Sequence, residues 1–386
     1  MIVSKKNLIV VITLLCLLGC ASNFNKSLDR EDQIVSIEKP SLKLKSYNFP
    51  KAINIILISR NKEKHKDSLT GIISNYYFYK NNLGYSPRLR ILELPGSKRS
   101  DRCLEEKIKG FSIVLVLDIN KEDFPDYCLQ EVLSLKGLLI TSNSSIKKEK
   151  TNLNLINIDR QEDLKSMVNY ASENTRNKNI VIDNLLTKDK LYIKTIWEAL
   201  ERTTAMATTI SDTRNNEEIL AELLLIKRSK DRARELSRAI SSPVEYLPRR
   251  RGDIGSIFLS VDLLQARTLK PAIDYNFAES VEVYVVPNWE NEESYLKTEK
   301  DLEGVILIDM PFKLNAYAPF LDESVIKRNR SFAIGYDSYE LALVLSANKK
   351  RDLKFIGMTG RFSSSPKGKI NRKSLKVKVE KGKIKS

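Results

Sequence analysis

Residues 111–117 read Phe-Ser-Ile-Val-Leu-Val-Leu, an almost unbroken apolar run. A strand that is apolar on both faces is typical of the centre of a parallel sheet, because helices cover such a sheet on both sides. Similar apolar runs lie on either side of it along the chain, at 53–58, 89–94, 137–141 and 153–158. Helix-like stretches, with apolar residues three or four positions apart, separate these runs. The alternation predicts an α/β lobe with a mostly parallel sheet flanked by helices.

A second series of alternating elements begins near residue 180. It predicts strands at 180–182, 256–260, 281–286 and 302–308, and helices at 189–208, 217–240, 263–271 and 337–346. The period-two pattern from Leu375 to Val379 predicts an edge hairpin whose lysines face outward. Two such lobes, between which the chain passes again late in the sequence, predict a bilobed clamshell within residues 51–386. Lobe 1 would hold about 51–175 and 287–350, and lobe 2 about 176–286 and 351–386.

The first twenty residues predict export. Lys5 and Lys6 precede an apolar run from Leu8 to Leu18, which is typical of a secretory signal and too short to span a bilayer. The end of the run, Leu-Leu-Gly-Cys at 17–20, resembles a bacterial lipoprotein signal. That resemblance implies removal of residues 1–19 and acylation of Cys20. Cleavage beside an incidental cysteine is the alternative.

Ala21 follows the cysteine in place of the Asp that retains such lipoproteins in the inner membrane. The resemblance therefore implies the periplasmic side of the outer membrane. Residues 20–50 are polar and predict a flexible tether with a reach of roughly 30 Å. In this compartment Cys103 and Cys128 could form a disulfide, because each lies on an expected helix flanking the run at 111–117. Two buried free thiols are an equally good interpretation.

Composition excludes several classes of function. The chain has a formal net charge of +16 but only one histidine, His65, which argues against a His-based triad or a multi-His metal site. His65 lies in a polar stretch and is expected to be exposed. No P-loop, dinucleotide fingerprint or nucleophile motif is present in the sequence. We therefore expect no catalytic residue, no metal site and no cofactor.

Half of the net charge lies in the last 21 residues, which carry a charge of +8. This tail has no aromatic residue for base stacking, and an exported protein has little access to nucleic acid. Nucleic acid is therefore not an expected partner. Anionic cell-wall surfaces, including peptidoglycan, and anionic lipid surfaces are candidates, and a solvated face is the simpler interpretation.

Four segments of the second half resemble the LppC/LpoA family of outer-membrane lipoproteins. They are Arg251-Gly-Asp253 with Ile257–Ser260, Gln265–Arg267 with Lys270-Pro271, Asp301–Gly304 with Asp309–Pro311, and Gly335–Asp337 with Thr359–Arg361. The resemblance implies a domain like type I periplasmic binding proteins, here without the family's N-terminal helical-repeat domain. It also implies a non-enzymatic regulator that binds a bifunctional class A penicillin-binding protein and stimulates peptidoglycan transpeptidation. The alternative is a periplasmic solute-binding lipoprotein with a small ligand between its lobes.

Several residues in or near these segments are candidates for a cleft or a partner-binding surface. In open α/β lobes the carboxyl ends of strands line the cleft, which favours Ser260, Asp309 and the turn at 335–337. The simpler interpretation is structural: the aspartates cap helices and pair with arginines across the lobes, and Tyr336 packs in the core. The full candidate set is Arg251, Asp253, Ser260, Arg267, Asp309, Tyr336 and Asp337.

Overall fold

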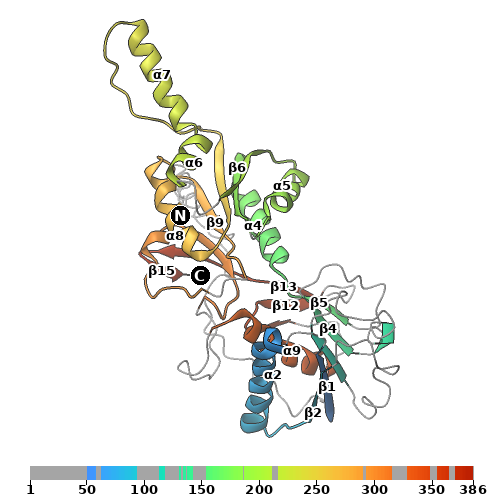
Figure 1. The fold of residues 1–386 in the computed structure, drawn as a ribbon. Helices are drawn as coiled ribbons and strands as arrows, with labels where there is room; N and C mark the ends of the chain where they lie inside the picture. The colour runs from blue at the N-terminus through green and yellow to red at the C-terminus, as the bar shows by residue number, and fades with distance from the viewer. Residues whose placement is uncertain are drawn as a thin grey trace, which may run out of the picture. The chain divides into compact units, whose positions relative to one another are not determined.

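The computed structural model describes residues 50–57, 62–93, 113–117, 130–131, 134–135, 137–141, 154–185, 187–210, 216–289, 293–314, 328–347, 354–364 and 370–385. They form a mixed α/β fold of parallel sheets flanked by helices, which confirms the predicted fold class (Figure 1). Cys20, Cys103 and Cys128 lie outside the described residues. No helix within the described ranges is long and apolar enough to cross a membrane.

The first sheet has five parallel strands in the order β2-β1-β3-β4-β5. The predicted central strand is confirmed, since β3 (Ile113–Leu117) lies in the middle and its residues 114–117 are buried. The strands around it are β1 (Ala52–Leu57), β2 (Arg88–Glu93), β4 (Gly137–Thr141) and β5 (Asn154–Asn157).

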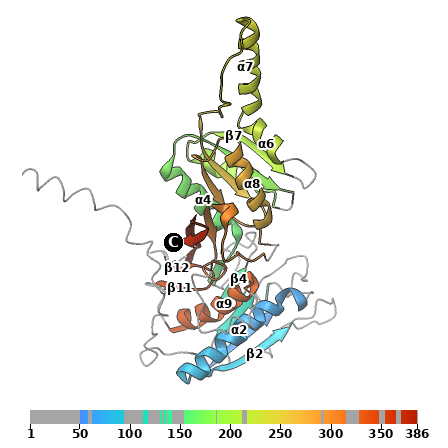
Figure 2. The same ribbon diagram turned by 90° about the vertical axis from the view of Figure 1, so that its left-hand side faces the viewer.

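Helices α2 (Lys62–Leu83) and α9 (Arg330–Ala347) lie side by side against this sheet (Figure 2). Two glycines permit the close contact. A Cβ atom at Gly71 would lie 2.1 Å from the carbonyl oxygen of Phe332, and one at Gly335 would lie 1.8 Å from that of Ser68. The backbones of the two helices therefore touch where they cross.

The expectation that His65 is exposed is wrong, because its side chain is only 8% exposed. His65 shares a helical face with Ser68 and Asn75, and all three are buried. Asn75 donates from Nδ2 to the carbonyl oxygen of Tyr336 at 2.8 Å and to Glu340 Oε2 at 3.3 Å. Polar residues thus share the buried face of α2 with Ile72 and Tyr79, and an apolar pattern alone could not reveal that they are buried.

The second sheet has seven strands in the order β15-β14-β10-β9-β8-β6-β7. Its parallel part consists of β6 (Lys178–Asn184), β7 (Thr204–Ile210), β8 (Ile254–Ser260), β9 (Glu282–Val285) and β10 (Ile306–Asp309). The predicted edge hairpin is confirmed as the antiparallel pair β14 (Leu375–Glu380) and β15 (Lys383–Lys385). Val377 and Val379 face the core, whereas Lys378, Lys383 and Lys385 are exposed.

Each face of the second sheet is covered by helices. One core contains residues from β8 and from α6 (Asn216–Leu223) and α8 (Leu263–Tyr275), and a short helix, η4 (Lys300–Leu302), also contributes. The other core contains residues from α4 (Arg160–Asn174) and α5 (Lys190–Ala199), where Trp197 packs edge-on against Phe258 at 5.3 Å. Successive residues of β8 point to opposite cores, as the pleat requires.

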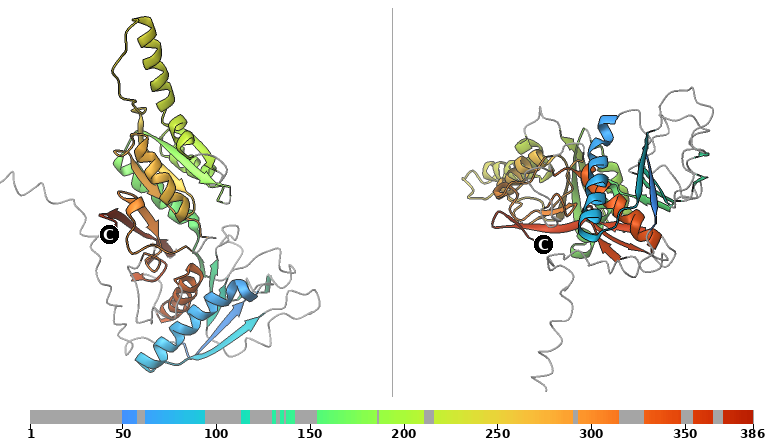
Figure 3. Two further views of the ribbon diagram at one scale, coloured as in Figure 1. Left: turned by 60° about the vertical axis from the view of Figure 1, so that its left-hand side comes forward. Right: turned by 90° about the horizontal axis from the view of Figure 1, so that it is seen from below.

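Two predicted helices differ from the structure. The helix expected over 189–208 ends at Ala199, and the following residues form strand β7 beside β6. The helix expected over 217–240 is divided into α6 and α7 (Ile226–Ala239), because Leu225 adopts a left-handed conformation with φ 58°. Helix α7 extends away from α6 and α8 in the side views (Figure 1; Figure 3, left).

A third, antiparallel sheet consists of β11 (Lys354–Ile356), β12 (Arg361–Ser364) and β13 (Ile370–Lys373). Phe355 and Phe362 stack at 4.8 Å and belong to the core of the first sheet. The first core receives Trp289 from the stretch before β10, which belongs to the second sheet, and then further residues from Met310 to Ile370. The predicted lobe boundaries near 287 and 351 stay predictions.

Candidate functional site

The carboxyl ends of β6, β8, β9 and β10 meet at one edge of the second sheet. Parallel open sheets bind ligands at this edge, so its polar groups are candidates for a site. The strands end in Asn184, Ser260, Val285 and Asp309, and Asp183, Ser260 and Asp309 are completely buried. The burial of these polar side chains requires partners.

Arg160, the first residue of α4, connects three elements at this edge. Its Nη2 donates to Ser260 Oγ and to the carbonyl oxygen of Val286, both at 2.8 Å, and its Nε donates to that of Pro287 at 2.7 Å. It also forms an ion pair with Asp189, whose Oδ2 accepts from Ser260 Oγ at 2.7 Å. Burial lowers the pKa of Arg160 to about 10, so the side chain remains charged at neutral pH.

Asp183 organises the neighbouring part of the edge. Its Oδ2 accepts a hydrogen bond of 2.9 Å from the Lys190 backbone nitrogen, and its Oδ1 accepts one of 2.6 Å from Thr209 Oγ1. Lys190 Nζ completes the set by donating to Thr209 Oγ1 at 2.6 Å. Asp183 therefore joins the start of α5 to strands β6 and β7.

Asp309, at the end of β10, is held by groups from three segments. Arg330 donates to it from Nη2 at 2.6 Å and from Nε at 3.2 Å, the Tyr295 hydroxyl donates at 3.1 Å, and the Met310 backbone nitrogen at 2.7 Å. Burial and the nearby Asp309 carboxylate raise the pKa of Tyr295 well above its usual value, so Tyr295 stays a hydrogen-bond donor. The Asp309–Arg330 pair fastens the point where the chain leaves the second sheet for α9.

Two candidates from the sequence lie elsewhere. Tyr336 is 1% exposed within the first core, which agrees with its simpler, packed interpretation. Asp337 accepts hydrogen bonds from the backbone nitrogens of Met358 and Thr359 at 2.8 and 2.7 Å, and from Thr359 Oγ1 at 2.6 Å. Burial raises the pKa of Asp337 to about 7. Both residues contribute to packing around α9 instead of lining the carboxyl edge.

The arginine candidates pair differently from the expectation. Arg251 forms a bidentate pair with Asp253 at 2.6 and 2.8 Å, within the turn that precedes β8 and so at the opposite edge from Ser260. This pairing holds the pKa of Asp253 well below its usual range. Arg267 pairs with Glu299 at 2.8 Å and fastens the 293–302 segment to α8.

None of the three candidate aspartates caps a helix. Asp337 lies inside α9, and the N-terminus of that helix is capped by Asn329, whose Oδ1 accepts from the Phe332 backbone nitrogen at 2.6 Å. The candidate residues predicted from the sequence do not include Arg160, Asp183 or Asp189. Asp183 directly follows the apolar run at 180–182, which could have marked it, whereas Arg160 has no local signal. Within the described ranges, no group of His, Cys, Asp and Glu side chains could hold a metal ion.

Comparison with known proteins agrees with this fold. Residues 193–379 match the model of the family described as LppC putative lipoprotein, which confirms the family resemblance found in the sequence. No curated protein sequence matches the chain.

Solved structures show the same fold at low sequence identity. Full-length LpoA from Haemophilus influenzae superposes with a TM-score of 0.58 and 14% identity, covering 89% of this chain and 60% of LpoA. The LpoA C-domain from that organism, described as a regulator of PBP1A, gives 0.56 and 14%, covering 86% of this chain and 98% of the domain. A putative branched-chain amino acid ABC transporter from Chromobacterium violaceum gives 0.56 and 15%, covering 84% and 98%. The chain thus spans 60% of the length of full-length LpoA.

Proposed function

We propose that this protein is a lipid-anchored regulator on the periplasmic side of the outer membrane. It binds a class A penicillin-binding protein and stimulates its transpeptidase activity. The observation that carries the proposal is the match to the LppC family over residues 193–379, within a fold shared with the LpoA C-domain. Stimulation requires tighter binding to the active conformation of the synthase than to the inactive one.

The carboxyl edge of the second sheet supports a protein partner over a small ligand. A small-ligand site presents convergent polar groups to the ligand. Here the polar groups bind one another: Arg160 holds Ser260 and Asp189, and Arg330 holds Asp309. The side chains of Arg160, Ser260 and Asp309 thus make these hydrogen bonds within the chain.

The test is a reconstituted crosslinking reaction. Residues 21–386, which contain every described residue, are mixed with the purified class A synthase of the source organism and lipid-linked precursor. Peptide crosslinks in the new glycan are counted with and without the protein, and binding is measured in parallel. We expect saturable binding and more crosslinks.

The control replaces the synthase with a variant that lacks its transpeptidase nucleophile, which should bind the protein without gaining crosslinks. No binding and no rise with the active synthase would contradict the proposal. The fold shared with the ABC transporter protein would then favour solute capture, to be tested by thermal shift with amino acids.

A further inference from the structure

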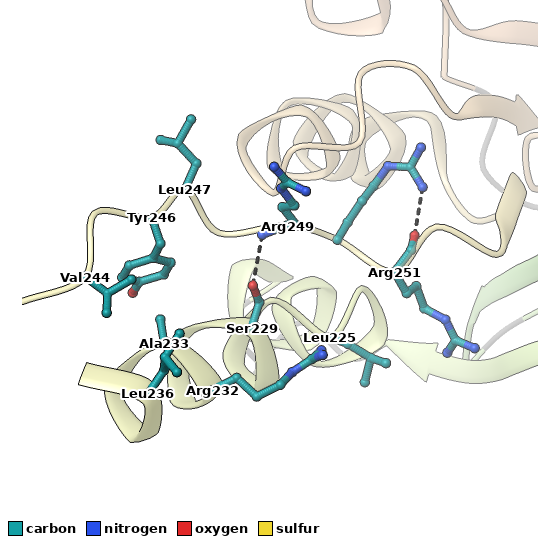
Figure 4. Close-up of a pocket in the computed structure, with 11 residues that line it drawn as sticks. Leu225, Ser229, Arg232, Ala233, Leu236, Val244, Tyr246, Leu247, Arg249 and Arg251 are labelled. Carbon is teal, nitrogen blue, oxygen red and sulfur yellow. Dashed lines mark hydrogen bonds between the residues drawn. The ribbon is translucent and has the colours of Figure 1, made fainter. Parts of the chain in front are cut away.

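Helix α7 and the segment that returns from it, residues 225–251, form a projection that we name the α7 arm. Only Ile226 is buried along the 14-residue helix. An isolated helix of this length is marginally stable in water, so it depends on packing of its apolar face. Among the described residues, the apolar face of α7 beyond Ile226 packs against the return segment from residue 243 onward (Figure 4).

The helix and the return segment enclose a groove with a volume of about 330 Å³. Two hydrogen bonds set its width: the Arg249 backbone nitrogen donates to Ser229 Oγ at 3.0 Å, and the Arg251 backbone nitrogen donates to the carbonyl oxygen of Leu224 at 2.9 Å. Hydrogen bonds within the chain therefore hold the two sides of the groove at a fixed separation. Its lining comes from Leu225, Ser229, Arg232, Ala233, Leu236, Val244, Tyr246, Leu247, Arg249, Arg250 and Arg251.

Large apolar side chains at the groove are left uncovered. Leu236 is 52% exposed, Tyr246 43% and Leu247 79%, and Ile240, next to them along the helix, is 55% exposed. A cluster of exposed apolar residues on one projection is typical of a protein interaction site, whereas isolated ones need no explanation. The uncovered face predicts that a partner packs against it.

The charge around the groove defines the partner's chemistry. Residues 226–251 contain nine Lys and Arg and only three Asp and Glu. Arg250 and Arg251 are engaged by Ser280 and Asp253. The guanidinium groups of Arg232 and Arg249 have no partner within the described part of the chain. Unpaired arginines beside an apolar floor match a carboxylate-bearing surface, because a guanidinium binds a carboxylate through two parallel hydrogen bonds.

We infer that the α7 arm is the docking surface for an acidic segment of the penicillin-binding protein. An apolar side chain of that segment enters the groove while flanking carboxylates pair with Arg232 and Arg249. This inference rests on the proposed function and adds the location of contact. A concave groove favours one anchoring side chain over a lipid surface, and the interspersed Asp231, Glu235 and Glu245 weaken attraction to uniformly anionic lipid.

The test compares charge reversals on the full-length chain, purified in detergent. The double variant Arg232→Glu/Arg249→Glu should bind the synthase about tenfold or more weakly, because it replaces attraction with repulsion at the rim. The matched control, Lys373→Glu/Lys383→Glu, makes the same change in net charge on the strands β13 and β15 and should bind as the wild type does. Leu247→Ser should weaken binding, whereas Leu191→Ser, at a leucine of α5 that is 71% exposed, should not. Circular dichroism verifies that each variant is folded.

The outcomes separate this inference from the proposed function. If the wild type binds the synthase and the Arg232/Arg249 variant binds equally well, the docking surface is wrong while the function stands. If the wild type does not bind, both fall. Phosphatidylglycerol vesicles serve as the second probe. Loss of vesicle binding with unchanged synthase binding would identify a lipid-binding arm and overturn the inference.

Discussion

Arg372 and Asp163, 209 positions apart in the chain, form a buried ion pair in which Nη2 of the arginine lies 2.7 Å from Oδ1 of the aspartate. Arg372 also donates to the carbonyl oxygens of Asp159 and Thr359 at 2.9 and 2.7 Å, and to Ser374 Oγ at 2.7 Å. One side chain thus joins two points where the chain passes between the first and second cores, before α4 and before β14.

Arg372→Met should therefore destabilise the protein strongly. It leaves the Asp163 carboxylate buried without its counter-charge, which typically costs about 3–5 kcal/mol in the free energy of unfolding. Chemical denaturation followed by circular dichroism measures the loss. The double variant Arg372→Met/Asp163→Leu should recover part of it, because no buried charge remains. A double variant less stable than the single one would contradict this account.

Stability should also decrease as the pH rises toward neutrality. Burial raises the pKa of Asp163 to about 6 and that of Asp337 to about 7. Each folded-state value exceeds the unfolded one, so the folded chain holds protons that the unfolded chain releases between about pH 4 and 7. The contribution of these groups is complete below about pH 4 and is lost as the pH rises through 7.

Asp337→Asn should flatten this dependence by up to about 1.4 kcal/mol per pH unit between pH 4 and 7. The measurement is a series of urea denaturations across that range for the wild type and the variant. A slope equal to that of the wild type would show that Asp337 does not change its protonation on unfolding.

Gly335→Ala should weaken the contact between α2 and α9. The new Cβ would lie 1.8 Å from the carbonyl oxygen of Ser68, so the helices must separate. Overpacking of this kind costs about 1–3 kcal/mol. Thermal unfolding should show a lower midpoint. Gly252→Ala is the matched control, because no atom lies within 4 Å of its Cβ position. Equal effects of the two substitutions would contradict the proposed crossing.

Cys20→Ala should release the protein from membranes, because it removes the residue expected to carry the lipid. Cell fractionation followed by a high-salt wash measures the partition of the protein. Cys16→Ala is the matched control, since Cys16 lies within the expected signal and should leave anchoring unchanged. Retention of the Cys20 variant after the wash would refute lipid anchoring.

The order of strands and helices could be predicted largely from the sequence, because burial leaves a local pattern. The apolar runs at 111–117 and 180–182 predicted strands that lie inside the two sheets. The alternating lysines after Leu375 predicted the edge hairpin. Helix breaks were harder to predict: the left-handed Leu225 that separates α6 from α7 has no Gly or Pro to mark it.

The sequence by itself determined the fold class, the expected cellular location and the absence of recognisable catalytic motifs, because hydrophobic periodicity and short motifs are local. Only the tertiary structure decided that His65 faces the interior, that Arg160 holds Ser260, and that Arg372 meets Asp163. These contacts join residues far apart in the chain, and polar residues become buried only where a distant partner is brought to them. The α7 arm depends on both the sequence and the tertiary structure. Its basic residues can be read from the sequence, but only the fold leaves its apolar face uncovered.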